Sequence, residues 1–168
     1  TTTTETYKYG EVPSYKGSTD KAADAQYTYT FTGWDPEIAA VTGDASYTAQ
    51  YESTVNEYTV TFVDYDGEVI DEQTVAYGTA AVAPADPERV GYTFTGWDVA
   101  FDNVTGDLTV TALYKINKYT VTFVDHDGTV VDQQIVEHGA NAVAPADPVW
   151  EGHEFAGWYG SYVNVTED

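Results

Sequence analysis

Two short acidic motifs contain the residues of this sequence that are best suited to binding a metal ion. They read D-Y-D-G at residues 64–67 and D-H-D-G at residues 125–128. An EF-hand calcium loop also needs further ligands, a glycine at its sixth position, a glutamate at its twelfth position and a helix after it. The first motif instead runs directly into Val69 and Ile70, which favour a strand. Because Asp-Gly is a typical hairpin turn, we predict two turns here and no metal site.

The histidines are a second set of candidate metal ligands. All of them lie in the last third of the chain, but none has the short spacing, such as H-x-x-x-H, that is typical of zinc ligands. Each occupies a place that holds a tyrosine in an earlier, closely similar stretch of the sequence. We therefore predict that one ring replaces another and that the role of these residues is structural: His126, His138 and His153.

No residue pattern in the sequence is typical of a catalytic centre. The chain has no Cys and no G-x-S-x-G motif, and none of its many carboxylates stands out as an acid–base pair. Gly33, Gly96 and Gly157 each precede a tryptophan at the end of a predicted strand, which is typical of a bulge and not of a phosphate-binding loop. We predict a protein that is not an enzyme and needs no cofactor.

The tryptophans fall into two groups. Three of them recur next to a glycine at one place of a repeating pattern, and such residues are expected to anchor a core: Trp34, Trp97 and Trp158. Trp150 occurs only once, beside Glu151 and Gly152, and we expect it to be exposed. Together with Tyr159 and Tyr162, Trp150 could form a platform on which a sugar stacks. These three aromatic residues are the predicted ligand contacts.

The recurring positions belong to a tandem array. Residues 58–114 return almost unchanged from residue 119 onward at a constant spacing, and part of the pattern also occurs once before them, around Trp34. Self-similarity at a fixed period indicates a repeat architecture. We predict an N-terminal repeat without an opening hairpin, a complete middle repeat, and a C-terminal repeat that stops before its last strand. Their bounds are 1–56, 57–116 and 117–168.

Apolar and polar residues of the middle repeat alternate as in half-buried strands. The alternation is clear over residues 58–62 and 108–114, and the runs at 69–77 and 92–97 predict two more strands. Helical periodicity is absent. We therefore predict a mainly β fold (α+β at most) of small tandem units with little or no helix. Residues 18–25 are compatible with a short helical turn or a polar loop, and we favour the loop.

Two segments join the predicted repeats. Residues 115–118 are too few for a flexible hinge, whereas residues 52–57 form a longer joint that we expect to bend more. The truncated C-terminal repeat leaves a sheet edge that could pair with another chain. Apart from such edge pairing, we expect a monomer.

The net charge of −22, from 28 acidic and 6 basic residues, restricts the partners. Such a surface repels the phosphates of nucleic acids and anionic lipids. No apolar run reaches the roughly 20 residues that a membrane-spanning helix needs, so we expect no membrane insertion within this sequence. The sequence also contains no Met, and we expect it to be part of a longer polypeptide.

Several motifs taken together resemble the Listeria–Bacteroides repeat, also called the internalin B-repeat. They are Y-T-V-T-F with D-x-D-G, A-x-A-P-A-D-P, G-Y-T-F-T-G-W and V-T-G-D. The resemblance covers the middle repeat, most of the C-terminal repeat and the latter half of the N-terminal repeat. It implies a small β-grasp (ubiquitin-like) fold and a place in large secreted or wall-anchored proteins of the bacterial surface. The family brings no catalytic residues.

These features predict an extracellular stalk or spacer that projects another domain and adds weak, multivalent adhesion. The alternative is a dedicated module that binds a host glycan, mucin or a matrix protein. An exposed, non-repeated aromatic patch would favour the binding module, whereas polar and evenly charged surfaces would favour the spacer.

Overall fold

The regular structure of the chain consists of β-strands. The computed structural model describes residues 2–168 and assigns no helix among them. The prediction of a mainly β fold is therefore confirmed, and the favoured loop at residues 18–25 is confirmed as well. The chain divides into two compact units. One comprises Thr1–Val60, Glu72–Val82 and Phe101–Leu108, and the other comprises Thr61–Asp71, Ala83–Ala100 and Thr109–Asp168.

Strands β1 (Tyr27–Asp35) and β2 (Thr48–Val55) form an antiparallel two-stranded sheet. The register shifts between Phe31 and Gly33, where Gly33 has a φ of 149°. This bulge brings Trp34 against its aromatic neighbours: its ring centroid lies 5.6 Å from that of Phe31 and 4.9 Å from that of Tyr15. Edge-to-face packing of this kind lets a short sheet bury apolar surface.

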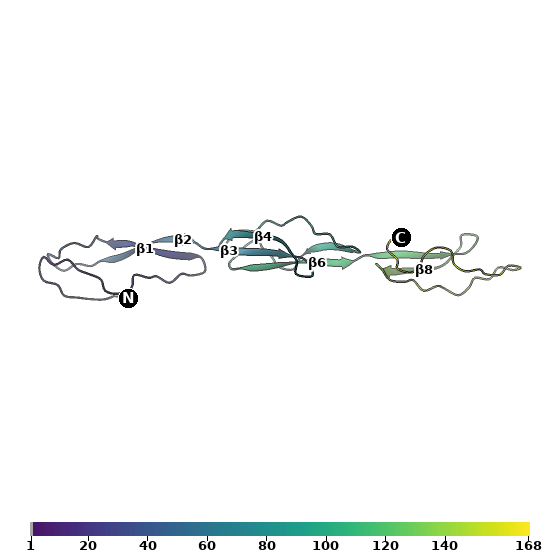
Figure 1. Ribbon diagram of the computed structural model, residues 1–168, viewed down its shortest axis with the longest axis horizontal. Helices are drawn as coiled ribbons and strands as arrows, with labels where there is room; N and C mark the ends of the chain where they lie inside the picture. Colours follow the sequence, from purple (N-terminus) through teal and green to yellow (C-terminus); the bar gives the residue numbers. More distant parts are fainter. Residues whose placement is uncertain (1) are drawn as a thin grey trace. The chain divides into compact units, whose positions relative to one another are not determined.

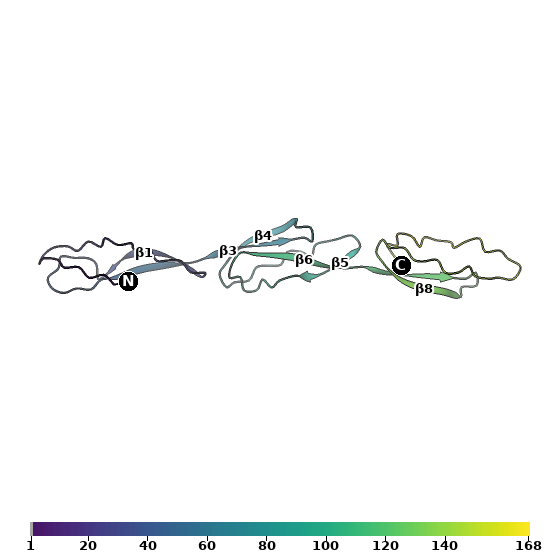
Figure 2. The ribbon, with the colours of Figure 1, turned by 90° about the horizontal axis from the view of Figure 1, so that it is seen from below.

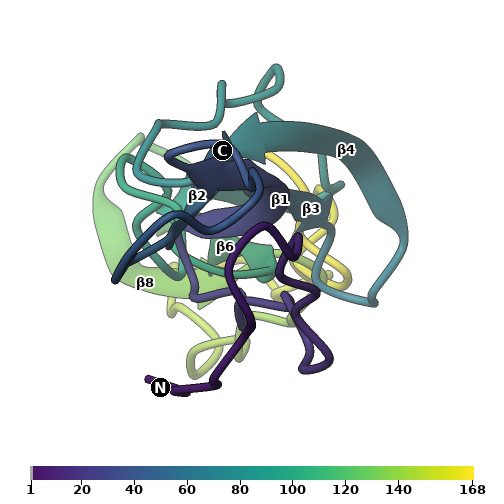
Figure 3. The same ribbon diagram turned by 90° about the vertical axis from the view of Figure 1, so that its left-hand side faces the viewer.

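The strands of the middle repeat form one four-stranded sheet in the order β4-β3-β6-β5 (Figures 1 and 2). Their bounds are β3 (Glu57–Val63), β4 (Val69–Ala76), β5 (Tyr92–Trp97) and β6 (Leu108–Ile116). Figure 3 shows the curved ribbon of β4. Alternate residues of β3 and β6 are buried, as the sequence alternation predicts: Val60, Phe62, Val110 and Ala112.

The C-terminal repeat contains a smaller sheet. Strands β7 (Lys118–Val124) and β8 (Val130–Glu137) pair antiparallel as a hairpin. Residues 153–158 match β5 in sequence but are not a strand. In the middle repeat, β5 pairs with β6, and the C-terminal repeat has no counterpart of β6 among the described residues. A strand needs a hydrogen-bonded neighbour, which explains the difference.

The joints between the predicted repeats are shorter than the sequence suggests. The expectation of a longer, more bendable joint at residues 52–57 is wrong, because β2 ends at Val55 and β3 begins at Glu57. Only Asn56 lies between them. Pairing of β2 with β1 continues to Val55 opposite Tyr27, and this uses the residues that would have formed the hinge. The second joint is equally short, with Asn117 between β6 and β7.

Candidate ligand-binding groove in the C-terminal repeat

An open groove of about 460 Å³ lies in the C-terminal repeat, within one compact unit. Residues 121–124 of β7 line one part of it, and residues 153–162 line another. The three predicted ligand contacts all border this groove: Trp150, Tyr159 and Tyr162. We call it the C-terminal groove.

The aromatic rings of the groove pack with the same geometry as those of the middle repeat. The ring centroids of Phe123 and Trp158 are 5.1 Å apart at 73°, and those of Phe155 and Trp158 are 5.3 Å apart at 65°. The equivalent pairs of the middle repeat, Phe62 with Trp97 and Phe94 with Trp97, have separations of 5.0 and 5.3 Å at 71° and 68°. Aromatic pairs at these distances and angles attract each other. The arrangement around Trp158 therefore forms although the C-terminal repeat has no strand equivalent to β6 among the described residues.

Trp150 is 46% exposed, but both faces of its indole are covered. The His126 ring stacks on it at 3.9 Å and 9°, and the His153 ring stacks on it at 3.5 Å and 5°. His153 also places Nδ1 3.2 Å from the carbonyl oxygen of Glu151. The two imidazole rings cover the faces of the indole, so the exposed part of Trp150 is its edge.

The other two predicted contacts differ in their surroundings. Tyr159 is fully exposed. Tyr162 is half-buried, and its ring lies 5.5 Å from that of Phe123. The structure thus brings the three residues to one groove but presents an accessible aromatic ring most clearly at Tyr159.

The middle repeat has a related stack at the same place. The guanidinium carbon of Arg89 lies 3.7 Å from the ring centroids of both Tyr65 and Tyr92. The repeat spacing that relates Tyr65 to His126 also relates Arg89 to Trp150, so the counterpart of Trp150 is Arg89. This stack was not predicted from the sequence, although the constant spacing of the repeats places Arg89 where the C-terminal repeat has Trp150.

The N-terminal repeat also places a cation on aromatic rings. The Lys21 Nζ atom is 3.4 Å from the ring centroid of Tyr29 and 5.6 Å from that of Tyr51. Lys21 belongs to the irregular segment before β1, so its partner could not be identified from strand patterns. Cation–π contacts of this type are favourable even at the surface.

Both acidic motifs are hairpin turns, as predicted. In the second, the Gly128 amide donates to the Asp125 carbonyl oxygen at 2.9 Å, and the Thr129 amide donates to the Asp127 carboxylate at 2.9 Å. Gly128 has a φ of 86°, a conformation that glycine accepts without strain. The first turn repeats the backbone bond, with the Gly67 amide 3.0 Å from the Asp64 carbonyl oxygen.

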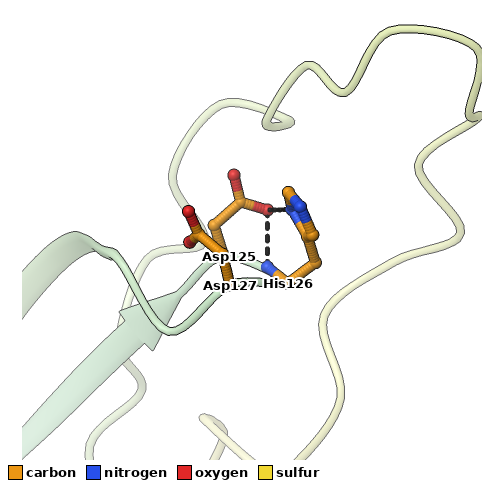
Figure 4. A group of neighbouring side chains, drawn as sticks. All are labelled: Asp125, His126 and Asp127. Carbon is orange, nitrogen blue, oxygen red and sulfur yellow. Dashed lines mark hydrogen bonds and ion pairs between the residues drawn. The ribbon is translucent and has the colours of Figure 1, made fainter.

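In the second turn, His126 lies between Asp125 and Asp127 in the sequence. Figure 4 shows Asp125, His126 and Asp127, whose potential ligand atoms all lie within 4.8 Å of one another. Asp125 Oδ1 is 3.0 Å from His126 Nδ1 and accepts a 2.7 Å hydrogen bond from the His126 amide. These bonds, the side-chain one foremost, hold the pKa of Asp125 below its usual value. Hydrogen bonds from Thr129 lower the pKa of Asp127. Hydrogen bonds within the turn therefore account for the lowered pKa values of both Asp125 and Asp127.

The third histidine lies apart from the groove lining. The His138 ring lies 5.9 Å from the Tyr119 ring, and the His138 amide donates to the Asn117 carbonyl oxygen at 2.9 Å. Two histidines thus belong to the stack on Trp150, and the third makes a contact near the second joint.

In the described part of the chain, no helix is long and apolar enough to cross a membrane.

Comparisons with known proteins agree with the resemblance in the motifs. The model of the Listeria-Bacteroides repeat domain matches residues 58–113 and 119–166, which together are more than half of the chain. A protein of Evansella cellulosilytica named "Putative membrane protein" is 34% identical over an alignment of 136 residues, which covers 75% of this chain and 20% of that protein. Internalin H of Listeria monocytogenes is 32% identical over an alignment of 136 residues, which covers 71% of this chain and 24% of that protein. The chain therefore spans about a fifth to a quarter of these relatives. On the strength of the two family matches, the chain belongs to the Listeria–Bacteroides repeat family.

Proposed function

We propose that this chain is a spacer segment in a protein of the bacterial cell surface and that it has no catalytic role. Its three repeats, at 1–56, 57–116 and 117–168, would be joined in series and would project another domain outside the cell. The family and the similarity to internalin H support the surface location. The sheet order β4-β3-β6-β5 supports a β-grasp arrangement of the middle repeat. The observation that carries the spacer role is the construction of the two joints.

Each joint consists of one asparagine whose backbone groups form hydrogen bonds with the repeat before it and with the repeat after it. At the first joint, the Asn56 amide donates to the Gln26 carbonyl oxygen at 2.8 Å, and the Asn56 carbonyl oxygen accepts from the Tyr77 amide at 2.8 Å. The Thr28 hydroxyl donates to Asn56 Oδ1 at 2.7 Å, and Asn56 Nδ2 donates to the Asp24 carbonyl oxygen at 2.8 Å.

The second joint repeats this arrangement. The Asn117 amide donates to the Gly91 carbonyl oxygen at 2.9 Å, and the His138 amide donates to the Asn117 carbonyl oxygen at 2.9 Å. The Thr93 hydroxyl donates to Asn117 Oδ1 at 2.7 Å. A joint with satisfied backbone and side-chain groups loses hydrogen bonds when it bends. Such joints support a spacer that resists bending.

The distribution of distances between the two ends of the chain tests the spacer role. Since the chain has no Cys, the pair Thr4→Cys and Glu167→Cys allows specific labelling for single-molecule energy transfer. We expect a narrow distribution that broadens when two glycines are inserted after Asn117. The same insertion after the exposed Gly43 is the control and should leave the width unchanged. A wild-type distribution as broad as that of the Asn117 insertion would contradict the spacer role.

The alternative, a module that binds a host glycan, mucin or a matrix protein, is supported by the meeting of Trp150, Tyr159 and Tyr162 at one groove. A binding screen against arrays of these ligands tests it. If the groove is adhesive, Tyr159→Ala should reduce binding, whereas Tyr9→Ala, at an exposed tyrosine of the N-terminal repeat, should not. Equal binding by both variants would place adhesion outside the groove.

A further inference from the structure

The ring stack of the middle repeat contains a permanent positive charge. The Arg89 guanidinium carbon lies 3.7 Å from the ring centroids of both Tyr65 and Tyr92, which is well within the distance of a cation–π contact. An arginine side chain is always protonated in proteins, so the charge of this contact does not change with pH. The contact forms beside strand β6, whose Tyr114 ring lies 5.6 Å from the same guanidinium carbon, so a stack of this kind and a complete sheet are compatible.

The C-terminal repeat has the same stack with the roles of its members exchanged. The Trp150 indole is the central ring, and the imidazoles of His126 and His153 lie 3.9 and 3.5 Å from it in nearly parallel planes. A histidine side chain is positively charged only after it takes up a proton, which for this residue type occurs between about pH 5 and pH 8. Cation–π contacts in this stack therefore depend on protonation.

Both imidazoles can take up a proton without losing a hydrogen bond. His126 Nδ1 lies 3.0 Å from Asp125 Oδ1 (Figure 4), and His153 Nδ1 lies 3.2 Å from the carbonyl oxygen of Glu151. Because a carboxylate and a carbonyl oxygen can only accept, Nδ1 is the donor in each ring, and the second proton goes to Nε2. Protonation of His126 converts its contact with Asp125 into an ion pair.

Carboxylates surround the stack on both of the segments that form it. They are Asp125 and Asp127 in the turn, and Glu151 and Glu154 in the connecting segment. The middle repeat has Val90 and Thr93 at the places of the two glutamates, so these negative charges are specific to the C-terminal repeat. The described residues that line the C-terminal groove include no Lys or Arg. The carboxylates therefore attract the positive charge that protonation places on the rings.

We propose that His126, Trp150 and His153 form a proton-sensitive clamp, which holds the turn at residues 125–128 more firmly against the connecting segment at residues 149–153 when the imidazoles are protonated. At acidic pH, each imidazolium lies on one face of the indole, which separates the two positive charges. The stack then contains cation–π contacts, as the middle repeat does permanently through Arg89. At alkaline pH, only contacts between neutral rings remain. The clamp is a property of the C-terminal repeat and does not rest on the spacer role.

Tryptophan fluorescence as a function of pH tests the protonation of the stack, because an imidazolium in contact with an indole quenches its emission. We expect the emission to fall as the pH is lowered from about 8 to about 5. The double variant His126→Tyr with His153→Tyr introduces the rings that the middle repeat has at these places, and it should lack this titration. His138→Tyr, which likewise introduces the ring of its counterpart Tyr77 but lies outside the stack, is the control and should titrate like the wild type.

Hydrogen exchange of single amides, followed by NMR, tests the clamp itself. The Gly128 amide donates to the Asp125 carbonyl oxygen at 2.9 Å, and the His153 amide donates to the Trp150 carbonyl oxygen at 3.0 Å. We expect the protection factors of these two amides to rise by about two- to fivefold when the pH is lowered from about 7.5 to about 5.5. This is the change that one cation–π contact at an exposed site would produce.

The middle repeat supplies an internal control for this measurement. The Gly67 amide donates to the Asp64 carbonyl oxygen, and the Tyr92 amide donates to the Arg89 carbonyl oxygen, both at 3.0 Å. The protection factors of these two amides should not change over the same pH interval, because the charge of Arg89 is constant. The comparison needs no variant, so it stands even if the double variant folds differently.

Three results would overturn the proposal. One is a wild-type emission that does not change over the pH range, and another is a titration that persists in the double variant. The third is an equal change with pH in the protection of Gly128 and of Gly67. The energy-transfer experiment does not depend on any of these results, so the spacer role and the clamp can fail separately.

Discussion

The stacks around Tyr29, Arg89 and Trp150 show how the repeats vary at the level of single residues. Lys21 and Arg89 place a permanent positive charge on tyrosine rings. Trp150 instead places an aromatic ring between two imidazoles. Two of the 6 basic residues thus make cation–π contacts, which are favourable even at exposed sites.

Tyr114 gives the chain a predicted sensitivity to high pH. Burial, followed by the hydrogen bond to Asp64, raises the pKa of Tyr114 from 10.0 to about 12. A raised pKa in the folded state means that this contribution to stability is complete below about pH 10 and is lost as the pH rises through about 12. We expect the free energy of unfolding, measured with urea, to fall over this interval.

The variant Tyr114→Phe should lose much of this dependence, because it lacks the ionisable group. Tyr9→Phe, at an exposed tyrosine, is the matched control and should follow the wild type. Equal pH dependence in Tyr114→Phe and the wild type would assign the alkaline loss of stability to other residues.

At the scale of the elements, the joint between β6 and β7 depends on a close approach of Gly91 to His138. A Cβ atom at Gly91 would overlap the imidazole ring of His138, and Gly91 has a φ of 77°. Both the contact and the backbone conformation oppose a side chain here. We expect Gly91→Ala to lower the free energy of unfolding by about 1–3 kcal/mol, measured by urea denaturation.

Gly43→Ala is the control, since a Cβ atom there would have no neighbour within 4 Å. The double variant Gly91→Ala with His138→Ala should recover part of the loss, because the ring that clashes is removed. A cost for Gly91→Ala no greater than that for Gly43→Ala would show that the joint adjusts freely.

At the scale of the whole molecule, the net charge of −22 opposes folding through mutual repulsion. Salt screens this repulsion, with a Debye length that falls from about 30 Å at 0.01 M to about 3 Å at 1 M. We expect the Tm to rise with NaCl concentration over this range, as measured by circular dichroism. A Tm that is constant or falls would mean that favourable ion pairs, and not repulsion, dominate the charge interactions of the folded state.

The sequence by itself determined the parts of this protein that depend on local pattern. Alternation over residues 58–62 and 108–114 identified strands β3 and β6, and the two Asp-Gly pairs identified the turns. These features were predictable because a half-buried strand alternates its side chains and because a tight turn needs particular residues. The repeated motifs also led to the correct family.

The tertiary structure alone decided the features that depend on distant partners. Residues 153–158 resemble β5 closely, yet they form no strand because the pairing neighbour is missing among the described residues. In the hinge expected at residues 52–57, residues 52–55 instead pair with β1. The cover on both faces of Trp150 comes from His126, on a separate turn, and from His153. Strand pairing and ring stacking depend on which segments meet in space, and the sequence pattern of one segment does not contain that information.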